Sequence, residues 1–399
     1  MKGHQNMLSI KHFLVVSMAL NVGLISRVLF IGDIKRGDVF FCPESEKTLP
    51  VDISREENHV EKKKNDATSI EIPISPPQAI MAPQKDDGSV INLDHGDPTM
   101  YEKYWKQTGD KTTVVIPGWQ LISYFSDIRN ICWFLENEFA DAIVKLHNKV
   151  GNAVTEGRHI VVGTGSTQLY QAVLYALCPD NSGSEPMSVV SAAPFYSSYP
   201  LMTDFLKSGL YKWGGDAHEF NADKPYIELV TSPNNPDGSS REAVVNGRRG
   251  ILVHDLAYLW PQYTPISSPA DHDIMLFTVS KSTGHAGTRL GWALIKDEEI
   301  ARKMTKFIEL NTIGVSKDSQ IRAAKILSHV SESIDNKPES DQGGDNFFEF
   351  AYDVMAKRWT QLRAAVNRTT LFSLPSFPSG TCSFSGHTFQ PQPGITWKE

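Results

Sequence analysis

Lys281 is the residue whose type and setting point most directly to chemistry. It follows Ser280 at the end of the apolar run 273–280, and Arg289 comes eight residues later among glycines. A lysine withdrawn from water has a lowered pKa, so its neutral amine can form an imine with a carbonyl group. The same residue could also be an ordinary lysine whose amine reaches the surface.

A second cluster, residues 163–168, could bind an anion. It reads Gly-Thr-Gly-Ser-Thr-Gln between a strand-like and a helix-like segment. Backbone amides and the hydroxyls of Ser166 and Thr167 would meet a phosphate at the helix N-terminus. Gln168 stands where the dinucleotide fingerprint has its third glycine, and no Gly-Lys-Ser/Thr of a nucleotide P-loop follows. Alternatively, the cluster is a tight turn whose hydroxyls only cap the helix.

The two remaining clusters contain Asn235 and the pair Asp255 and Tyr258. Asn235 lies in the segment 231–238, Thr-Ser-Pro-Asn-Asn-Pro-Asp-Gly, and Asp255 ends the apolar run 250–255. A carboxylate at the end of a buried strand needs a strong partner, such as a cation or a protonated ring nitrogen. Taken singly, these segments could be a proline-rich turn and an unremarkable strand-end aspartate.

Together, the four clusters match the requirements of pyridoxal 5′-phosphate. This cofactor needs a lysine for its imine and a carboxylate on its pyridinium nitrogen. Asn and Tyr side chains suit its phenolic oxygen, and a cup of Ser, Thr and Arg suits its phosphate. The order of the clusters along the chain resembles that of fold-type I enzymes that use this cofactor. No metal site is expected.

These clusters require a sheet whose strands end at one edge, where ligands collect in open α/β folds. Beyond residue 89, short apolar runs bounded by Gly, Pro, Asn or Asp are typical of a covered, mainly parallel sheet. We predict strands at 159–163, 188–192, 226–231, 250–255 and 273–280, helices at 168–177 and 347–367, mainly helical structure over 298–329, and a polar loop at 331–346. The predicted fold class is α/β, with a smaller C-terminal portion.

The chain divides into four predicted parts. Residues 89–330 form a large cofactor-binding α/β domain, and 331–399 form part of a small C-terminal domain. Residues 33–88 lack periodicity, contain the charge run 55–66 and several prolines, and are predicted to be a flexible linker. That charge run could also be a solvated segment without a partner.

Residues 1–32 are predicted to be a hydrophobic anchor. The stretch 13–31 is almost wholly apolar, and as a helix it would span about 28 Å, close to the ~30 Å hydrocarbon thickness of a bilayer. Lys2 and Lys11 precede it, and no small-x-small cleavage motif follows. We expect an uncleaved, single-pass anchor of open orientation; a cleaved signal peptide and a buried helix are the alternatives.

Composition limits the classes of protein further. The 399 residues are 40% hydrophobic and 21% charged, with a net charge of −7, which excludes a wholly disordered, collagen-like or polytopic membrane chain. Mild acidity argues against nucleic-acid binding. The four cysteines, Cys42, Cys132, Cys178 and Cys382, are scattered and include no CxxC, so neither a zinc module nor a disulfide-rich scaffold is indicated.

Longer segments carry a resemblance to the plant tryptophan aminotransferase-related family, whose catalytic domain is alliinase-like. The similar segments include VVGTGSTQLYQA, APFYSSYP, SPNNPDG, HDLAYLWPQYTPI and DHDIMLFTVSKSTGHAGTRLGWALIKD. The resemblance runs from about residue 91 to residue 393. The hydrophobic segment and polar stalk before it are similar to those of the membrane-anchored branch, which implies the endoplasmic reticulum membrane.

The resemblance implies a role for each candidate residue. Lys281 would hold pyridoxal phosphate as an imine and, once freed, move a proton between the substrate Cα and the cofactor. Asp255 would pair with the pyridinium nitrogen, and Asn235 and Tyr258 with the phenolic oxygen. The phosphate would be bound by Ser166, Thr167, Ser280 and Arg289, together with Tyr124 from the second subunit of a homodimer. Trp119 and Tyr124 would help to shape an indole-sized pocket.

The implied activity is transfer of the amino group of L-tryptophan to a 2-oxo acid such as pyruvate, giving indole-3-pyruvate for auxin synthesis. One alternative is an alliinase-like C–S lyase, although alliinases carry a cysteine-rich module and 33–88 holds only Cys42. Another is a cofactor-binding dimerisation partner of low activity. The family's carboxylate-binding arginine lies in a terminal segment without a counterpart here, so we expect an incomplete small domain and impaired turnover of tryptophan.

Overall fold

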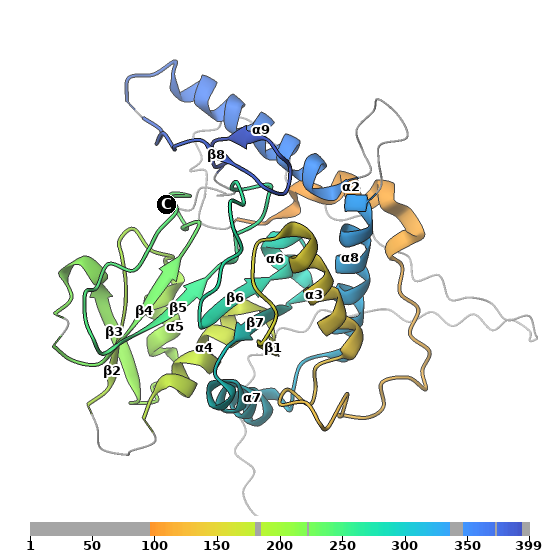
Figure 1. The fold of residues 1–399 in the computed structure, drawn as a ribbon, viewed down its shortest axis with the longest axis vertical. Coiled ribbons are helices and arrows are strands. Elements are labelled where there is room, and N and C mark those ends of the chain that lie inside the picture. The colour runs from red at the N-terminus through yellow and green to blue at the C-terminus, as the bar shows by residue number, and fades with distance from the viewer. Residues whose placement is uncertain (1–95, 180–184, 222, 336–345, 372, 393–399) are drawn as a thin grey trace, which may run out of the picture. The chain divides into compact units, whose positions relative to one another are not determined.

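A seven-stranded sheet lies at the centre of the part of the chain that the structure describes (Figure 1). The structure is a computed structural model that describes residues 96–179, 185–221, 223–335, 346–371 and 373–392. The strand order is β1-β7-β6-β5-β4-β2-β3. The strands are β1 (His159–Gly163), β2 (Met187–Ser191), β3 (Tyr211–Asp216), β4 (Tyr226–Thr231), β5 (Gly250–Asp255), β6 (Ile274–Thr278) and β7 (Gly291–Ile295).

The sheet is mainly parallel, as the sequence predicts. Only β7 runs against its neighbours β1 and β6, while the pairs from β6 through β5, β4 and β2 to β3 are parallel. Every residue of β4 and β6 is buried, because helices cover both faces of such a sheet. Glu228 within β4 is tolerated because its carboxylate accepts hydrogen bonds from the amides of Val244 and Val245.

Helices pack on both faces of the sheet. Successive strand residues point to opposite faces, so Trp292 and Gly291 of β7 mark the two sides. Trp292 donates to His147 of α3, whereas Gly291 lies against the first turn of α4. The helices are α2 (Glu102–Thr108), α3 (Asn137–Val150), α4 (Gly165–Leu177), α5 (Ser198–Phe205), α6 (Val279–Ser282), α7 (Glu298–Thr312), α8 (Lys317–Asp335) and α9 (Phe347–Val366).

An aromatic core fills the space between the sheet and α3. Phe277 of β6 stacks on Trp292 of β7 with ring centroids 5.8 Å apart, and Trp260 contacts both rings. Stacked and edge-to-face rings of this kind stabilise beyond the area they bury. Short 3₁₀ turns at Thr99–Tyr101, Gly109–Thr112, Ala217–Glu219 and Ala286–Thr288, and a small hairpin of β8 (Gly380–Thr381) and β9 (Thr388–Phe389), complete the described elements.

Three of the five predicted strands have the observed bounds, at 159–163, 226–231 and 250–255. The run 273–280 differs, because the strand ends at Thr278 and Lys281 lies in the short helix α6. Thr278 causes the change, since its hydroxyl oxygen accepts the amide of Ser280 and caps that helix. The helical region predicted at 298–329 consists of two helices, α7 and α8, separated at Ile313, which has a left-handed φ of 53°.

The predicted polar loop 331–346 begins later than expected. Helix α8 continues to Asp335 because Ser331 and Ser333 are buried and bond back to carbonyls one turn earlier. The described residues from 96 onward belong to one compact unit, and the boundary predicted at 330 falls inside α8. The predicted anchor at 1–32 and linker at 33–88 lie outside the described residues. Among the described residues, no helix has the length and hydropathy needed to cross a bilayer.

Candidate active site

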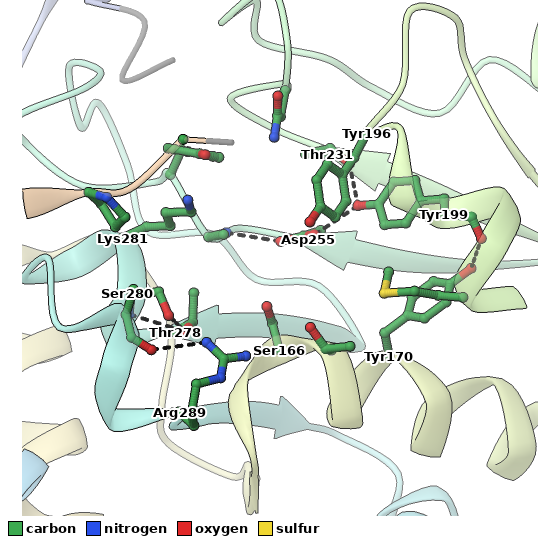
Figure 2. Close-up of a pocket in the computed structure, with 18 residues that line it drawn as sticks. Ser166, Tyr170, Tyr196, Tyr199, Thr231, Asp255, Thr278, Ser280, Lys281 and Arg289 are labelled. Carbon is green, nitrogen blue, oxygen red and sulfur yellow. Dashed lines mark hydrogen bonds between the residues drawn. The ribbon is translucent and has the colours of Figure 1, made fainter. Parts of the chain in front are cut away.

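A cavity of about 240 Å³ opens at the carboxyl ends of β4, β5 and β6 (Figure 2). These strands are parallel neighbours, so their last residues, Thr231, Asp255 and Thr278, come together at one edge. Eight of the nine predicted cofactor-binding residues line the cavity, namely Ser166, Thr167, Asn235, Asp255, Tyr258, Ser280, Lys281 and Arg289. The edge of the sheet that the sequence predicts as the site therefore holds a cavity with the predicted side chains around it.

One end of the cavity is suited to a phosphate. Helix α4 begins there at Gly165, and Ser166 and Thr167 follow in its first turn. In the described part of the chain neither hydroxyl has a hydrogen-bond partner, so both remain available to an anion at the positive end of the helix. Gly291 allows the approach of this helix, because a Cβ there would lie 2.8 Å from the amide nitrogen of Ser166.

Arg289 supplies a cation at the same end. Its φ of 53° is left-handed, which is uncommon for a residue with a side chain and which costs free energy on the order of 1 kcal/mol. The guanidinium donates to the carbonyl of Ala286 at 3.0 Å and lies directly over Gly165. A Cβ on Gly165 would approach Nη2 of Arg289 to 2.7 Å, so glycine at this position makes room for the arginine.

Lys281 faces the cavity from α6, with its side chain half-buried. Its Nζ lies 5.4 Å from the centroid of the Tyr258 ring. The backbone of this short helix is held from the far side: Tyr263 donates its hydroxyl to the Lys281 carbonyl at 3.0 Å, and Gln262 donates to the Ser282 carbonyl at 3.0 Å. Two buried donors therefore fix the position from which the lysine reaches the cavity.

Asp255 lies across the cavity from the phosphate end. Its Oδ1 accepts the amide of Ala257 at 3.1 Å, and its Oδ2 accepts the hydroxyl of Tyr199 at 2.8 Å. Burial raises the pKa of Asp255 above its ordinary value, while the two hydrogen bonds and the charge of Lys281 oppose that rise. A protonated ring nitrogen beside this carboxylate would supply a positive charge, which stabilises the ionised carboxylate where little water reaches it.

Asn235 and Tyr258 line the cavity between these groups. Asn235 is held by its neighbour Asn234, which is buried and donates to the carbonyl of Pro194 at 2.9 Å and to Asp237 at 2.9 Å. The turn that follows β4 is therefore fixed by its own polar side chains. That fixation leaves the Asn235 amide free to serve a ligand.

Tyr124 and Trp119 lie apart from the cavity of this chain. Their side chains are 67% and 76% exposed, in a segment of turns and bends that also exposes Ile122, Phe125 and Ile128. The expectation that Tyr124 serves the cofactor site of a second subunit stays a prediction. Within one chain, neither residue contributes to the cavity.

Several tyrosines at the site are not predicted from the sequence. They are Tyr196 just before α5, Tyr199 in the first turn of α5, and Tyr170 of α4, and all three line the cavity. The motif APFYSSYP contains two of them, but its letters do not show that α5 crosses the end of β5 and brings Tyr199 to Asp255. No sequence signal marks this crossing, because Tyr196 precedes the helix and α5 is short.

The comparisons with known proteins decide the family. The family model described as "Allinase" matches residues 91–399. The chain belongs to this family. Tryptophan aminotransferase-related protein 2 of Arabidopsis thaliana is 56% identical over 391 residues, covering 98% of this chain and 84% of the relative. The protein of the same name from Oryza sativa is 59% identical, covering 77% and 62%. Alliin lyase of Allium cepa var. aggregatum is 36% identical, covering 79% and 70%.

Solved structures are more distant. An aminotransferase from Staphylococcus aureus has 19% identity and a TM-score of 0.48, covering 72% of this chain and 77% of its own. The family assignment rests on the sequence relatives. The strand order and the mainly parallel, covered sheet confirm the predicted fold class.

Pyridoxal 5′-phosphate is the cofactor of this family. The residues of the cavity fit it at each of its polar positions. Free hydroxyls and Arg289 at the start of α4 suit the phosphate, and Lys281 suits the aldehyde carbon. Asp255, a half-buried carboxylate that no cation of the described residues contacts by a hydrogen bond, suits the ring nitrogen. No group of three or more His, Cys, Asp or Glu side chains in the described residues could hold a metal.

Proposed function

We propose that this protein is a pyridoxal-phosphate-dependent aminotransferase that moves the amino group of L-tryptophan to pyruvate, giving indole-3-pyruvate for auxin synthesis. The observation that carries the proposal is the cavity itself, with Lys281, Asp255 and the phosphate cup in one chain. The tryptophan specificity is supported by the name of a relative that is 56% identical over 98% of the chain.

The residues of the cavity divide the work. Bound pyridoxal phosphate supplies an electron sink for the bonds at the substrate Cα. Lys281 is the proton carrier, because its amine lies in the cavity and forms no ion pair with a carboxylate of the described residues. Asp255 keeps a positive charge on the ring nitrogen, and Ser166, Thr167, Ser280 and Arg289 orient the group through its phosphate.

A C–S lyase is the rival that has an observation in its favour. Alliin lyase is 36% identical over 79% of the chain, and the same lysine and aspartate would serve a lyase. The relatives named for tryptophan aminotransferase are more similar, at 56% and 59% identity. Reaction outcome, rather than cofactor binding, separates the two proposals.

One assay separates them. Purified protein loaded with pyridoxal phosphate is given L-tryptophan and pyruvate, and indole-3-pyruvate is measured; in parallel, pyruvate released from an S-alkyl cysteine sulfoxide is measured without an acceptor. We expect indole-3-pyruvate that depends on the acceptor. Pyruvate release alone would support the lyase, and neither product, despite full cofactor loading, would support a dimerisation partner of low activity.

We also propose that the protein acts as a homodimer in which Tyr124 serves the neighbouring site. The support is the exposed apolar segment that carries it, including Trp119 at 76% and Ile122 at 80% exposure. Large exposed apolar side chains in one segment are typical of an interface. Sedimentation should give the mass of a dimer, and replacing Trp119 and Ile122 with Ser should weaken it.

Membrane attachment through residues 1–32, at the endoplasmic reticulum, is the remaining proposal. It rests on the apolar stretch 13–31 in the sequence.

A further inference from the structure

The hydroxyl of Tyr199 is a buried polar group that directly contacts Asp255. Tyr199 is 2% exposed; it donates to Oδ2 of Asp255 at 2.8 Å, and its oxygen lies 2.7 Å from Oγ1 of Thr231. Figure 2 shows the hydroxyl between these two partners. A phenol has one proton, so when Tyr199 gives it to the carboxylate, Thr231 must donate to the phenol oxygen.

The two hydrogen bonds on Asp255 leave one side of the carboxylate open. Oδ2 takes Tyr199 and Oδ1 takes the amide of Ala257, while an ionised carboxylate has about four acceptor positions. Both donors come from the protein wall, from α5 and from the loop after β5. The remaining acceptor positions are available to a ligand in the cavity that Asp255 lines.

Packing against neighbouring rings also fixes the ring of Tyr199. Tyr170 stacks on it with ring centroids 5.3 Å apart, and Tyr196 meets it edge-on at 5.3 Å. Thr203 donates to the Tyr199 carbonyl at 2.7 Å. Because both the ring and the hydroxyl of Tyr199 are fixed, this side chain can hold Asp255 in one orientation at little further cost in conformational entropy.

We propose that Tyr199 is a positioning residue for Asp255, which keeps that carboxylate ionised and turned toward the ring nitrogen of pyridoxal phosphate. The proposal rests on the proposed cofactor site and deepens it. It does not depend on which amino acid is the substrate.

Toward Asp255, Tyr199 acts only as a donor. Burial and the neighbouring Asp255 raise the pKa of Tyr199 well above its ordinary value, so the phenol keeps its proton. The other titratable groups that face Asp255 are Lys281 of α6 and Tyr170 of α4, while Tyr258 lies in the same cavity wall. From β4, the neutral hydroxyl of Thr231 completes the surroundings.

Tyr199→Phe removes the hydroxyl and keeps the ring. Without this donor Asp255 takes a proton more readily, and less positive charge stays on the cofactor ring. The nitrogen that joins the cofactor to Lys281 then binds its proton more tightly. We expect the pH midpoint of the visible absorbance of the bound cofactor to rise by about 0.5–1 unit, in the direction of the larger shift in Asp255→Asn.

Two further comparisons separate positioning from packing. Tyr226→Phe removes a hydroxyl from an equally buried tyrosine at the opposite end of β4, where it donates to the Val245 carbonyl at 3.0 Å, and should leave the midpoint unchanged. Thr231→Val should raise the midpoint partly, and Thr231→Ser should restore it.

An unchanged midpoint in Tyr199→Phe, beside a shift in Asp255→Asn, would overturn the proposal. If Tyr199→Phe does not retain the cofactor, the pair Thr231→Val and Thr231→Ser decides, and equal midpoints there would overturn it too. The absorbance is measured without an amino acid. The test of Tyr199 therefore remains valid even if the protein does not transaminate tryptophan.

Discussion

At the scale of single residues, the site depends on small side chains as much as on reactive ones. Gly165 has a left-handed φ of 71° and lies under the guanidinium of Arg289, whose Nη2 would be 2.7 Å from a Cβ at that position. Both constraints act on the first turn of the helix that presents Ser166 and Thr167. A side chain at residue 165 would therefore strain the backbone and push the Arg289 guanidinium away from its present place.

Gly165→Ala should weaken cofactor binding more than it weakens the fold. The added methyl group displaces Arg289 and strains the backbone by about 1–2 kcal/mol, so we expect the Kd for pyridoxal phosphate to rise roughly 10-fold or more. Gly287→Ala is the matched control, because a Cβ at position 287 meets nothing within 4 Å. Equal affinity of the two variants, by titration of the apoprotein, would show that the cup tolerates a side chain.

Some residues of the site can be predicted from the sequence and others cannot. Lys281, Asp255 and Arg289 could be chosen because each follows an apolar run or lies among glycines, and strand ends converge in this fold. Tyr199 could not be chosen, because its importance comes from where α5 crosses the sheet. A short, weakly amphipathic helix gives no sequence signal for that crossing.

At the scale of elements, the buried strands β4 and β5 can be predicted from sequence, whereas β3 and β7 are harder to predict. The runs 226–231 and 250–255 are mainly apolar and bounded by turn residues, which indicates both ends of β4 and β5. The strand β3, Tyr-Lys-Trp-Gly-Gly-Asp, has no such run and lies at the edge of the sheet, where less burial is required. The residues of β7 directly follow the arginine motif, without a turn segment that would mark the start of a strand.

Helix α3 is attached to the sheet by a buried histidine. His147 is fully buried; its Nε2 accepts the indole N–H of Trp292 at 3.0 Å, so Nδ1 carries the proton and donates to Asn152 at 2.8 Å. Burial lowers the pKa of His147 from 6.5 to about 4. The unfolded chain therefore binds a proton at a higher pH than the folded one does.

This difference makes stability depend on pH. Because the folded pKa is depressed, the contribution of neutral His147 is fully present above about pH 6.5 and is lost as the pH falls toward 4. We expect the loss of unfolding free energy between pH 6.5 and 4.5 to be about 2 kcal/mol smaller in His147→Gln than in wild type. Urea denaturation at both pH values measures it. A wild-type pH slope in the variant would contradict the buried neutral state.

At the scale of the whole molecule, sequence predicts the organisation of the catalytic part better than that of its surroundings. The α/β class follows from strand-like and helix-like segments that alternate, and the described residues from 96 onward confirm it. The exposed apolar segment around Trp119 has no periodicity, so sequence alone does not indicate how its side chains are arranged.

Membrane attachment is a prediction at the same scale. If residues 13–31 form a spanning helix, the full chain should sediment with membranes and resist carbonate extraction, because about 19 apolar residues match the hydrocarbon thickness. A chain lacking residues 1–32 should be released and should still bind pyridoxal phosphate. A full-length, uncleaved chain that stays in the supernatant would show that this stretch is not an anchor.

The central claim is that Lys281 carries pyridoxal phosphate in the cavity at the ends of β4, β5 and β6. Reduction of the holoprotein with borohydride, followed by peptide mass spectrometry, tests it most directly because it fixes the cofactor to the amine that holds it. We predict the added phosphopyridoxyl mass on the peptide that contains Lys281, and its loss in Lys281→Ala, with Lys296→Ala, an exposed lysine, as the unaffected control. The same mass on another lysine of the wild-type protein, with Lys281 unmodified, would contradict the account.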